Sequence, residues 1–464
     1  MTVFRKPISD CIEFGWLNRE NFRADTAKSC ARRMPARLAG GVMLCLLLAG
    51  FALADDTKTA TATTYQHLDV DQWIEKLDDE DKESRRRAAY ALGQIGPPAV
   101  QAVPALIKVA DDKQLEVGWY ALDALGRIGP AARDAVPGIV EIVEKSADYA
   151  TLRLSGIRAL GRIGVSEGGA SSAIESALKD GKGEIRVAAA LALWQLDRRA
   201  SAIDALAAEL DDSSAEVAFS AATALAQLGG DAAPADRALM KALGHDDSDV
   251  RRAAGRALSH LGMPVVTPLL KSLQYSDRFN RLNVIQTLGW IVETHRRDVL
   301  ERPELTEREY LQAAVPLHRD VVPALVKIFD DDDAGVRNAA VKTVGRMGPL
   351  ILPFLLDTLQ SGSVRAREGA AGSLAEMQSF LRPASQRPAG VQRIVRSSMK
   401  KLIDALSSDD RTTREAAFRL FDAIQPDRQD ASAATAALRD GLRDENVMIR
   451  RYAARSLERF SQQP

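Results

Sequence analysis

Cysteine is almost absent from this chain. The 464 residues include three cysteines, and all of them lie near the N-terminus, at Cys11, Cys30 and Cys45. The sequence after residue 45 therefore has no disulfide, no thiolate metal ligand and no cysteine nucleophile. This excludes the protein classes that depend on such groups.

Histidine is also rare, and it is not placed for catalysis. None of the five histidines is followed by glutamate; they are His67, His245, His260, His295 and His318. The chain has no HExxH or GxSxG motif, no P-loop and no glycine-rich dinucleotide turn. The acidic run at 330–333 is not followed by both the glycine and the glutamate of a calcium loop at their expected positions. We therefore expect no catalytic residue, no metal ligand and no cofactor.

Aromatic residues make up only 5% of the sequence, whereas hydrophobic residues make up 46%. The core must therefore be aliphatic and rich in alanine, as in stacked helices. No segment shows sustained alternation of apolar and polar residues, so we expect no sheet.

A short pattern recurs instead: an arginine opens a helix of small residues, which ends in glycine and often proline, as in "RRRAAYALGQIGPP". Its copies are 30 to 36 residues apart, except for two intervals of 56 and 47. They start at Arg85, Gly118, Arg153, Arg186, Ala218, Arg251, Arg281, Arg337, Arg367, Arg414 and Arg450. Repetition at this period is typical of solenoid proteins.

Each repeat is interpreted as two helices. The first helix often begins with proline, as in "AVPALIKVADD", and the second has apolar or small residues three and four positions apart. Because one such pair cannot bury its own apolar faces, successive pairs must stack. We predict an all-α fold, a right-handed α-α superhelix (α-solenoid) of about eleven helical hairpins, in one domain spanning residues 66–464.

Nine of the copies keep the opening arginine, one turn after an acidic corner between the two helices. A guanidinium can bond carboxylates and carbonyls of adjacent corners, so we predict a structural ladder along the stack. We call these nine residues the ladder arginines: Arg85, Arg153, Arg186, Arg251, Arg281, Arg337, Arg367, Arg414 and Arg450.

These repeats resemble the HEAT-repeat family, in particular the short, regular repeats of phycobilin-lyase-like HEAT proteins. The resemblance extends over residues 66–464 and departs from the pattern at Gly118 and Ala218. It implies a solenoid that binds other proteins. Deoxyhypusine hydroxylase, built on similar repeats, holds iron through His-Glu pairs, which this chain lacks. Phycobilin lyases act inside photosynthetic cells, which conflicts with the N-terminal segment described next.

Residues 34–54, "MPARLAGGVMLCLLLAGFALA", have the layout of a secretory signal with cleavage after Ala54. A retained membrane anchor is the alternative. Residues 1–33 precede this signal and are interpreted as an upstream extension. Without residues 1–54 the chain has 54 basic and 59 acidic residues, a net charge of −5. We therefore expect an exported protein (periplasmic or extracellular) that binds no nucleic acid and meets a membrane only through an uncleaved N-terminal segment.

Two insertions interrupt the repeats, near residues 293–320 and 380–391. The first is charged and includes "ELTEREYLQAAV", which can form an amphipathic helix, and the second has the composition of a loop. Either is a surface insertion or a contact element.

The second helices are expected to line the concave side of the solenoid. Positions that point away from the predicted core hold apolar and aromatic residues in the second to fifth repeats, with arginines beside them. Such a patch usually marks a partner site, unless neighbouring helices bury it or the helical register is one residue off. The candidate partner-binding residues are Trp119, Leu154, Arg158, Val187, Leu191, Trp194, Phe219, Arg252 and Arg256.

The sequence thus predicts an exported, non-catalytic scaffold that binds a protein or peptide. Two alternatives remain open: a HEAT-type enzyme or enzyme accessory, lyase-like or hydroxylase-like, and a purely architectural envelope protein. The partner's identity and the oligomeric state do not follow from the sequence.

Overall fold

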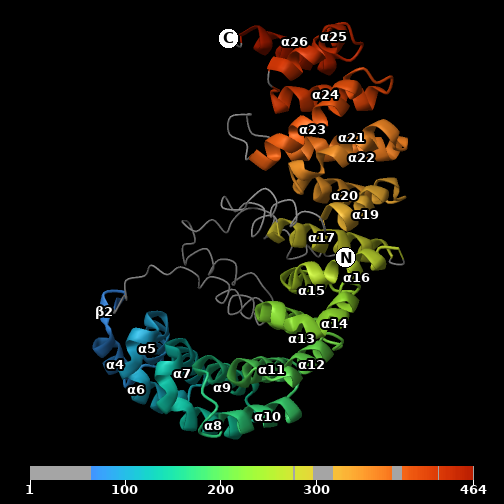
Figure 1. The fold of residues 1–464 in the computed structure, drawn as a ribbon. Helices are drawn as coiled ribbons and strands as arrows, with labels where there is room; N and C mark the ends of the chain where they lie inside the picture. The colour runs from blue at the N-terminus through green and yellow to red at the C-terminus, as the bar shows by residue number, and fades with distance from the viewer. Residues whose placement is uncertain (1–63, 275–276, 296–316, 379–388, 427, 463–464) are drawn as a thin grey trace, which may run out of the picture. The chain divides into compact units, whose positions relative to one another are not determined.

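The computed structural model describes residues 64–274, 277–295, 317–378, 389–426 and 428–462. Within these residues the chain is an all-α solenoid, as predicted, in which pairs of helices follow one another along the sequence (Figure 1). Each helix packs against its partner and against helices of the next pair. The described residues contain eleven pairs, the number that the repeats predict.

The first helices of the pairs are α4 (Val70–Leu77), α6 (Val103–Ala110), α8 (Val136–Lys145), α10 (Ala170–Asp180), α12 (Ala200–Glu209), α14 (Asp236–Ala242), α16 (Val266–Ser272), α19 (Val322–Lys327), α21 (Leu352–Ser361), α23 (Ala389–Leu406) and α25 (Arg428–Gly441). The second helices are α5 (Lys82–Ile95), α7 (Leu115–Ile128), α9 (Ala150–Ile163), α11 (Glu184–Asp197), α13 (Ala215–Leu228), α15 (Ser248–Leu261), α17 (Arg278–His295), α20 (Ala334–Arg346), α22 (Val364–Met377), α24 (Arg411–Ile424) and α26 (Val447–Gln462). Short 3-10 turns lie at Pro97–Ala102, Gly129–Ala135, Gly229–Ala235, Met263–Val265, Ile328–Asp330 and Pro349–Ile351, and a π-helical turn at Leu317–Val321.

Local signals set the ends of the second helices. Aspartates of the acidic corners serve as N-caps: the Asp247 carboxylate accepts hydrogen bonds from the amides of Asp249 and Val250 at 2.7 and 3.1 Å. At the other end, Gly96 and Gly262 adopt a φ of 70°, a conformation that side chains other than glycine's disfavour. Corner aspartates therefore start several second helices, and one of them, Asp410, both caps α24 and lies 3.4 Å from the ladder arginine Arg367.

A small sheet precedes the first pair, so the expectation of no sheet is wrong there. Strands β1 (Thr64–Tyr65) and β2 (Leu68–Asp69) are antiparallel, and Tyr65 pairs with Leu68. The turn between them has positive φ at Gln66 and His67, and the Trp73 indole donates a hydrogen bond to the Tyr65 carbonyl at 3.1 Å. Two-residue strands are too short to show alternation in the sequence.

Small residues bring the second helices close together. A Cβ added to Gly126 of α7 would lie 3.1 Å from the Ala159 Cα of α9, and one on Gly161 of α9 would lie 3.0 Å from the Ala192 Cα of α11. We call this contact line the Gly–Ala seam. It explains why the repeats place small residues at these positions.

The seam ends at α11, where Trp194 occupies the position that Gly126 and Gly161 hold in α7 and α9. Helices α11 and α13 approach each other less closely than α9 and α11 do. The buried apolar side chains form two clusters that meet at α11, one spanning Val70 to Ala202 and the other Val187 to Ala453. Trp194 is partly buried and packs against both clusters, in place of the glycine that meets a neighbouring backbone in the preceding repeats.

The predicted signal segment at 34–54 lies outside the described residues, as do most of both insertions: residues 296–316 and 379–388. Among the residues that the structure does describe, no single helix has the length and apolar composition to cross a membrane. One bent pair, Ala334–Arg346 with Pro349–Ser361, meets both criteria together, with an angle of 106° between its parts.

Candidate functional site

The ladder arginines lie at the corners between the two helices of each pair. Arg85 shows the full geometry: its Nη1 donates to the carbonyls of Asp79 and Glu80 at 2.8 and 2.9 Å, and its Nε donates to the Asp112 carboxylate of the next corner at 2.7 Å. The Arg85 guanidinium thus joins two successive repeats. Hydrogen bonding to Asp112 raises the pKa of Arg85.

Other ladder arginines repeat this geometry in whole or in part. Arg414 bonds the carbonyls of its own corner and the Asp444 carboxylate at 3.0 Å, and Arg281 reaches Asp331 at 3.0 Å. Arg186 pairs with Glu209, and Arg367 lies 3.4 Å from Asp410. Arg251, Arg337 and Arg450 donate to carbonyls of their own corners, and Arg153 is buried.

Packing explains the two departures from the ladder. A Cβ at Gly118 would lie 2.5 Å from the Ala110 carbonyl oxygen at the end of α6, so no side chain fits there. Ala218 is fully buried. The neighbouring helices occupy the space that an arginine would need.

The exposed side of α5, α7, α9, α11 and α13 carries most of the candidate partner-binding residues, and we call it the second-helix face. Two residues do not belong to it. Leu154 and Val187 are 9% and 5% exposed, so the prediction that they are accessible is wrong. Neighbouring second helices approach closely enough to cover short aliphatic side chains at these positions.

Larger side chains remain accessible. Trp119, Leu191, Trp194 and Phe219 are half-buried. The Arg198 guanidinium stacks on the Trp194 ring, 3.7 Å from its centroid. One face of the Trp194 indole thus lies against a cation and part of the ring remains in solvent, where a partner can contact it.

The two arginines predicted on α15 differ in their contacts. Arg252 lies 3.6 Å from Asp249, one turn earlier, and is half-buried, whereas Arg256 is exposed. Both lie one repeat beyond Phe219. The position of Arg252 is held by apolar side chains in the four preceding repeats, whereas that of Arg256 is held by Leu191 on α11 and by polar side chains on α7, α9 and α13.

An aromatic row at the start of the face extends the predicted set. Tyr65 and Tyr90 meet edge to face with centroids 6.1 Å apart, Tyr90 and Tyr120 with centroids 5.9 Å apart, and Trp119 stacks on Tyr120 at 5.2 Å. Arg86 lies 5.5 Å from the Tyr120 centroid. Tyr90 is 41% exposed. Sequence reasoning missed Tyr65 and Tyr120 because the first lies before the repeats and the second is one position from the predicted face.

Arg158 lies on α9, in the middle of the second-helix face. Its guanidinium has no hydrogen bond or ion pair within the described part of the chain, although Glu184 of α11 and Asp123 of α7 act on it at longer range. Asp123 is already engaged, because it accepts from Arg127 and Arg162 at 2.7 and 2.6 Å. Burial lowers the pKa of Arg158. Arg158 is nevertheless half-buried rather than fully covered, so its guanidinium can pair with an anionic ligand.

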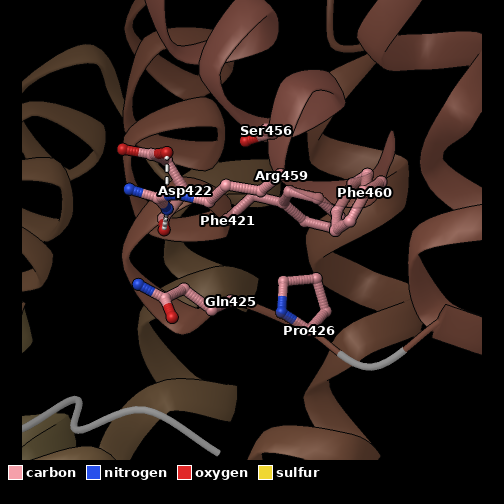
Figure 2. Close-up of a pocket in the computed structure, with 7 residues that line it drawn as sticks. All are labelled: Phe421, Asp422, Gln425, Pro426, Ser456, Arg459 and Phe460. Atoms are coloured by element: carbon pink, nitrogen blue, oxygen red, sulfur yellow. Dashed lines mark hydrogen bonds and ion pairs between the residues drawn. The ribbon is translucent and has the colours of Figure 1, made fainter. Parts of the chain in front are cut away.

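The last two pairs enclose a pocket of about 230 Å³ between α24 and α26 (Figure 2). The rings of Phe421 and Phe460 meet edge to face in it, and Arg459 donates to the Asp422 carboxylate at 3.0 Å. Arg455 lies 3.5 Å from the same carboxylate. Both guanidinium groups of this pocket thus lie against the Asp422 carboxylate.

The residues that the structure describes contain no group of three or more His, Cys, Asp or Glu side chains placed to hold a metal ion. Of the ladder, the second-helix face and the small pocket, the second-helix face is the candidate functional site, because it holds partly exposed aromatic side chains beside an arginine that has no ion pair within the described residues.

Comparison with known proteins agrees with the repeat architecture. The family model described as HEAT repeats matches residues 70–161 and 237–315. A curated relative, an uncharacterised phycocyanin operon protein Z of Pseudanabaena tenuis (strain PCC 7409), is 27% identical over 124 residues, which are 26% of this chain and 53% of the relative. The chain thus spans about half the length of that relative.

Several solved structures are similar, with low sequence identity. An engineered protein is 20% identical with a TM-score of 0.32, and the match covers 84% of this chain and 98% of that protein. Importin beta in an ammonium sulfate condition is 15% identical with a TM-score of 0.46, over 84% of this chain and 56% of importin beta. Kap95p, from a study of its binding to RanGDP, is 14% identical with a TM-score of 0.41, over 84% of this chain and 57% of that one. The helical pairs, their spacing and the family model agree: residues 70–161 and 237–315 of this chain match HEAT repeats, and the described residues form an α-solenoid.

Proposed function

We propose that the chain is an exported, non-catalytic HEAT-repeat scaffold that binds a protein or peptide on its second-helix face. HEAT-repeat solenoids are typical protein-interaction scaffolds, and a stack of repeats offers an extended surface for this purpose. Two parts of this function go beyond the fold: the face that binds the partner and the compartment in which the protein acts.

One observation carries the choice of face. Leu191 of α11 is half-buried five residues after its ladder arginine, whereas the equivalent positions in the next four repeats hold half-buried Thr223 and exposed Arg256, Gln286 and Lys342. Three positions after Leu191, Trp194 stands where glycine occurs in the preceding repeats. Large apolar groups that remain partly exposed among polar equivalents favour a contact surface.

The test uses Trp194→Asp in the full chain, with Trp290→Ala as the matched control. Trp290 is a half-buried tryptophan on the second helix α17, outside the proposed site. A photo-crosslinking amino acid at Leu191 should capture a partner in cells, and Trp194→Asp should abolish that capture with unchanged helical circular dichroism. Capture that survives Trp194→Asp but is lost in Trp290→Ala would place the binding surface elsewhere.

Export has a separate test. Fractionation of producing cells should find the chain outside the cytoplasm with Asp55 as its N-terminal residue. Replacing Ala52 and Ala54 by leucine should block this cleavage, because signal cleavage requires small residues before the cut. Cytoplasmic protein that retains residues 34–54 would contradict the proposal.

A further inference from the structure

Several arginines of α5, α7, α9 and α11 form ion pairs with carboxylates of the same chain. Arg86 pairs with Glu83 at 2.7 Å, and Arg127 and Arg162 share Asp123. Arg186 is bidentate on Glu209. Paired in this way, these guanidinium groups have their charge compensated inside the protein.

Arg158 differs from these arginines. It lies on the same face, yet no hydrogen bond or ion pair within the described residues compensates it. Arg158 is half-buried, and its nitrogens are not among the buried side-chain atoms that lack a partner, so a ligand can reach the guanidinium. An anion that pairs with it there forms charge-assisted hydrogen bonds, which are stronger than those between neutral groups.

The helices on either side of Arg158 restrict which ligand can bring an anion to it. Helix α9 lies between α7, which holds Trp119 and Tyr120, and α11, which holds Leu191 and Trp194. The equivalent position on α7 is Asp123, whose carboxylate is occupied, so little negative charge competes for Arg158 from that side. A ligand for this place needs one negative charge with apolar groups on both sides of it.

We propose that Arg158 binds a carboxylate of an extended partner segment whose flanking aromatic or aliphatic side chains lie against Trp119 and Trp194. This inference rests on the proposed function, because it specifies the chemistry of the partner on the same face. The planar guanidinium matches a carboxylate with two parallel hydrogen bonds, and both tryptophans offer flat apolar surfaces. The partner segment is therefore acidic and aromatic or aliphatic, rather than basic.

The experiment selects ligands from a displayed library of random twelve-residue peptides on the immobilised full chain. Peptides enriched on the wild-type protein should carry Asp or Glu next to aromatic or aliphatic residues. One enriched peptide and its counterpart with Asn or Gln at the acidic position are then synthesised, and their affinities are measured by fluorescence anisotropy. The proteins compared are the wild type, Arg158→Gln, Trp194→Ala and the control Arg133→Gln, which makes the same chemical change on an exposed arginine outside the face.

We expect Arg158→Gln to bind the acidic peptide about ten- to a hundredfold more weakly than the wild type, as for the loss of a charge-assisted hydrogen bond. The wild type should bind the neutral peptide more weakly than the acidic peptide by the same factor. Arg158→Gln should bind the neutral and the acidic peptide equally. Arg133→Gln should bind like the wild type. The free Arg158→Gln protein should unfold at the same or a higher temperature, because it loses an uncompensated charge and no internal bond.

The other outcomes separate the two proposals. Peptides that need Trp194 but bind Arg158→Gln and the neutral peptide normally would overturn the anion site and leave the second-helix face in place. No enrichment on the wild type would refute both proposals. A phosphoserine at the acidic position that binds tenfold more tightly than glutamate would assign the site to phosphoryl groups and contradict the carboxylate. A lower unfolding temperature of Arg158→Gln with unchanged binding would make Arg158 structural.

Discussion

The ladder makes the sharpest prediction, at Arg186 of α11. Its Nε and Nη2 donate to the two oxygens of Glu209 at 2.6 and 2.7 Å, and Glu209 itself is only 9% exposed. The substitution Arg186→Met keeps the aliphatic stem but removes the charge. It leaves the Glu209 carboxylate largely buried, with no guanidinium to pair with.

The expected loss follows from this geometry. Removing one partner of a fully buried ion pair costs about 3–5 kcal/mol, whereas exposed pairs contribute at most about 1 kcal/mol. Because the Arg186 side chain is 32% exposed and that of Glu209 is 11% exposed, we expect an intermediate loss of about 2–3 kcal/mol. The double substitution with Glu209→Gln should recover about 1.5 kcal/mol, which measures the coupling between the two residues.

Arg337→Met is the matched control. Arg337 also donates to its own corner, to the carbonyls of Asp331 and Asp332 at 2.6 and 3.0 Å, where Arg186 donates to the Gly181 carbonyl at 3.3 Å. Within the described residues Arg337 pairs with no carboxylate. We expect this change to cost only about 1 kcal/mol, since the exposed corner carbonyls can bind water instead.

The assay is urea denaturation followed by circular dichroism, with hydrogen exchange of α11 and α12 to locate the change, because long repeat arrays do not always unfold in one step. Equal losses for Arg186→Met and Arg337→Met, or additive effects of Arg186→Met and Glu209→Gln, would refute the idea that the ladder joins successive corners. In that case the arginines would stabilise only the turn in which they lie.

Three further predictions follow from the same contacts. Burial alone would raise the pKa of Asp112 and Asp444, but hydrogen bonds from arginine side chains and backbone amides outweigh it and hold both pKa values below the ordinary 3.8. The two carboxylates therefore stabilise the fold well above pH 3.8, and this stabilisation is lost as the pH falls through their lower pKa values in the folded protein. The urea midpoint should drop between about pH 5 and pH 2, and it should drop by less in Asp112→Asn. Gly161→Ala should destabilise the chain by about 1–2 kcal/mol despite the better helix propensity of alanine, because the new Cβ would lie 2.9 Å from the Ala192 Cβ; a stabilised variant in thermal melts would contradict the close approach in the seam. Trp194→Gly should bring α11 and α13 closer together and slow hydrogen exchange in both helices. Faster exchange in both helices would contradict this, because it would show that the indole stabilises the contact between α11 and α13 rather than holding the two helices apart.

Much of this molecule was readable from the sequence because the relevant signals are local. Glycine and proline mark the ends of the helices, and an arginine one turn after an acidic corner indicates the fork that Arg85 and Arg414 make. The period of the repeat predicted the eleven helical pairs. None of these inferences needed the distance between residues of different repeats.

The surface could not be obtained in the same way. Whether Leu154 is covered, or whether Arg158 meets a carboxylate, depends on how closely residues some 30 positions away approach. The sequence by itself determined the helices and their pairing, and it predicted which arginines open the second helices. Only the tertiary structure decided which side chains of the second helices remain accessible, because this depends on how closely neighbouring helices approach: glycine meets alanine between α9 and α11, whereas α11 and α13 lie less close together.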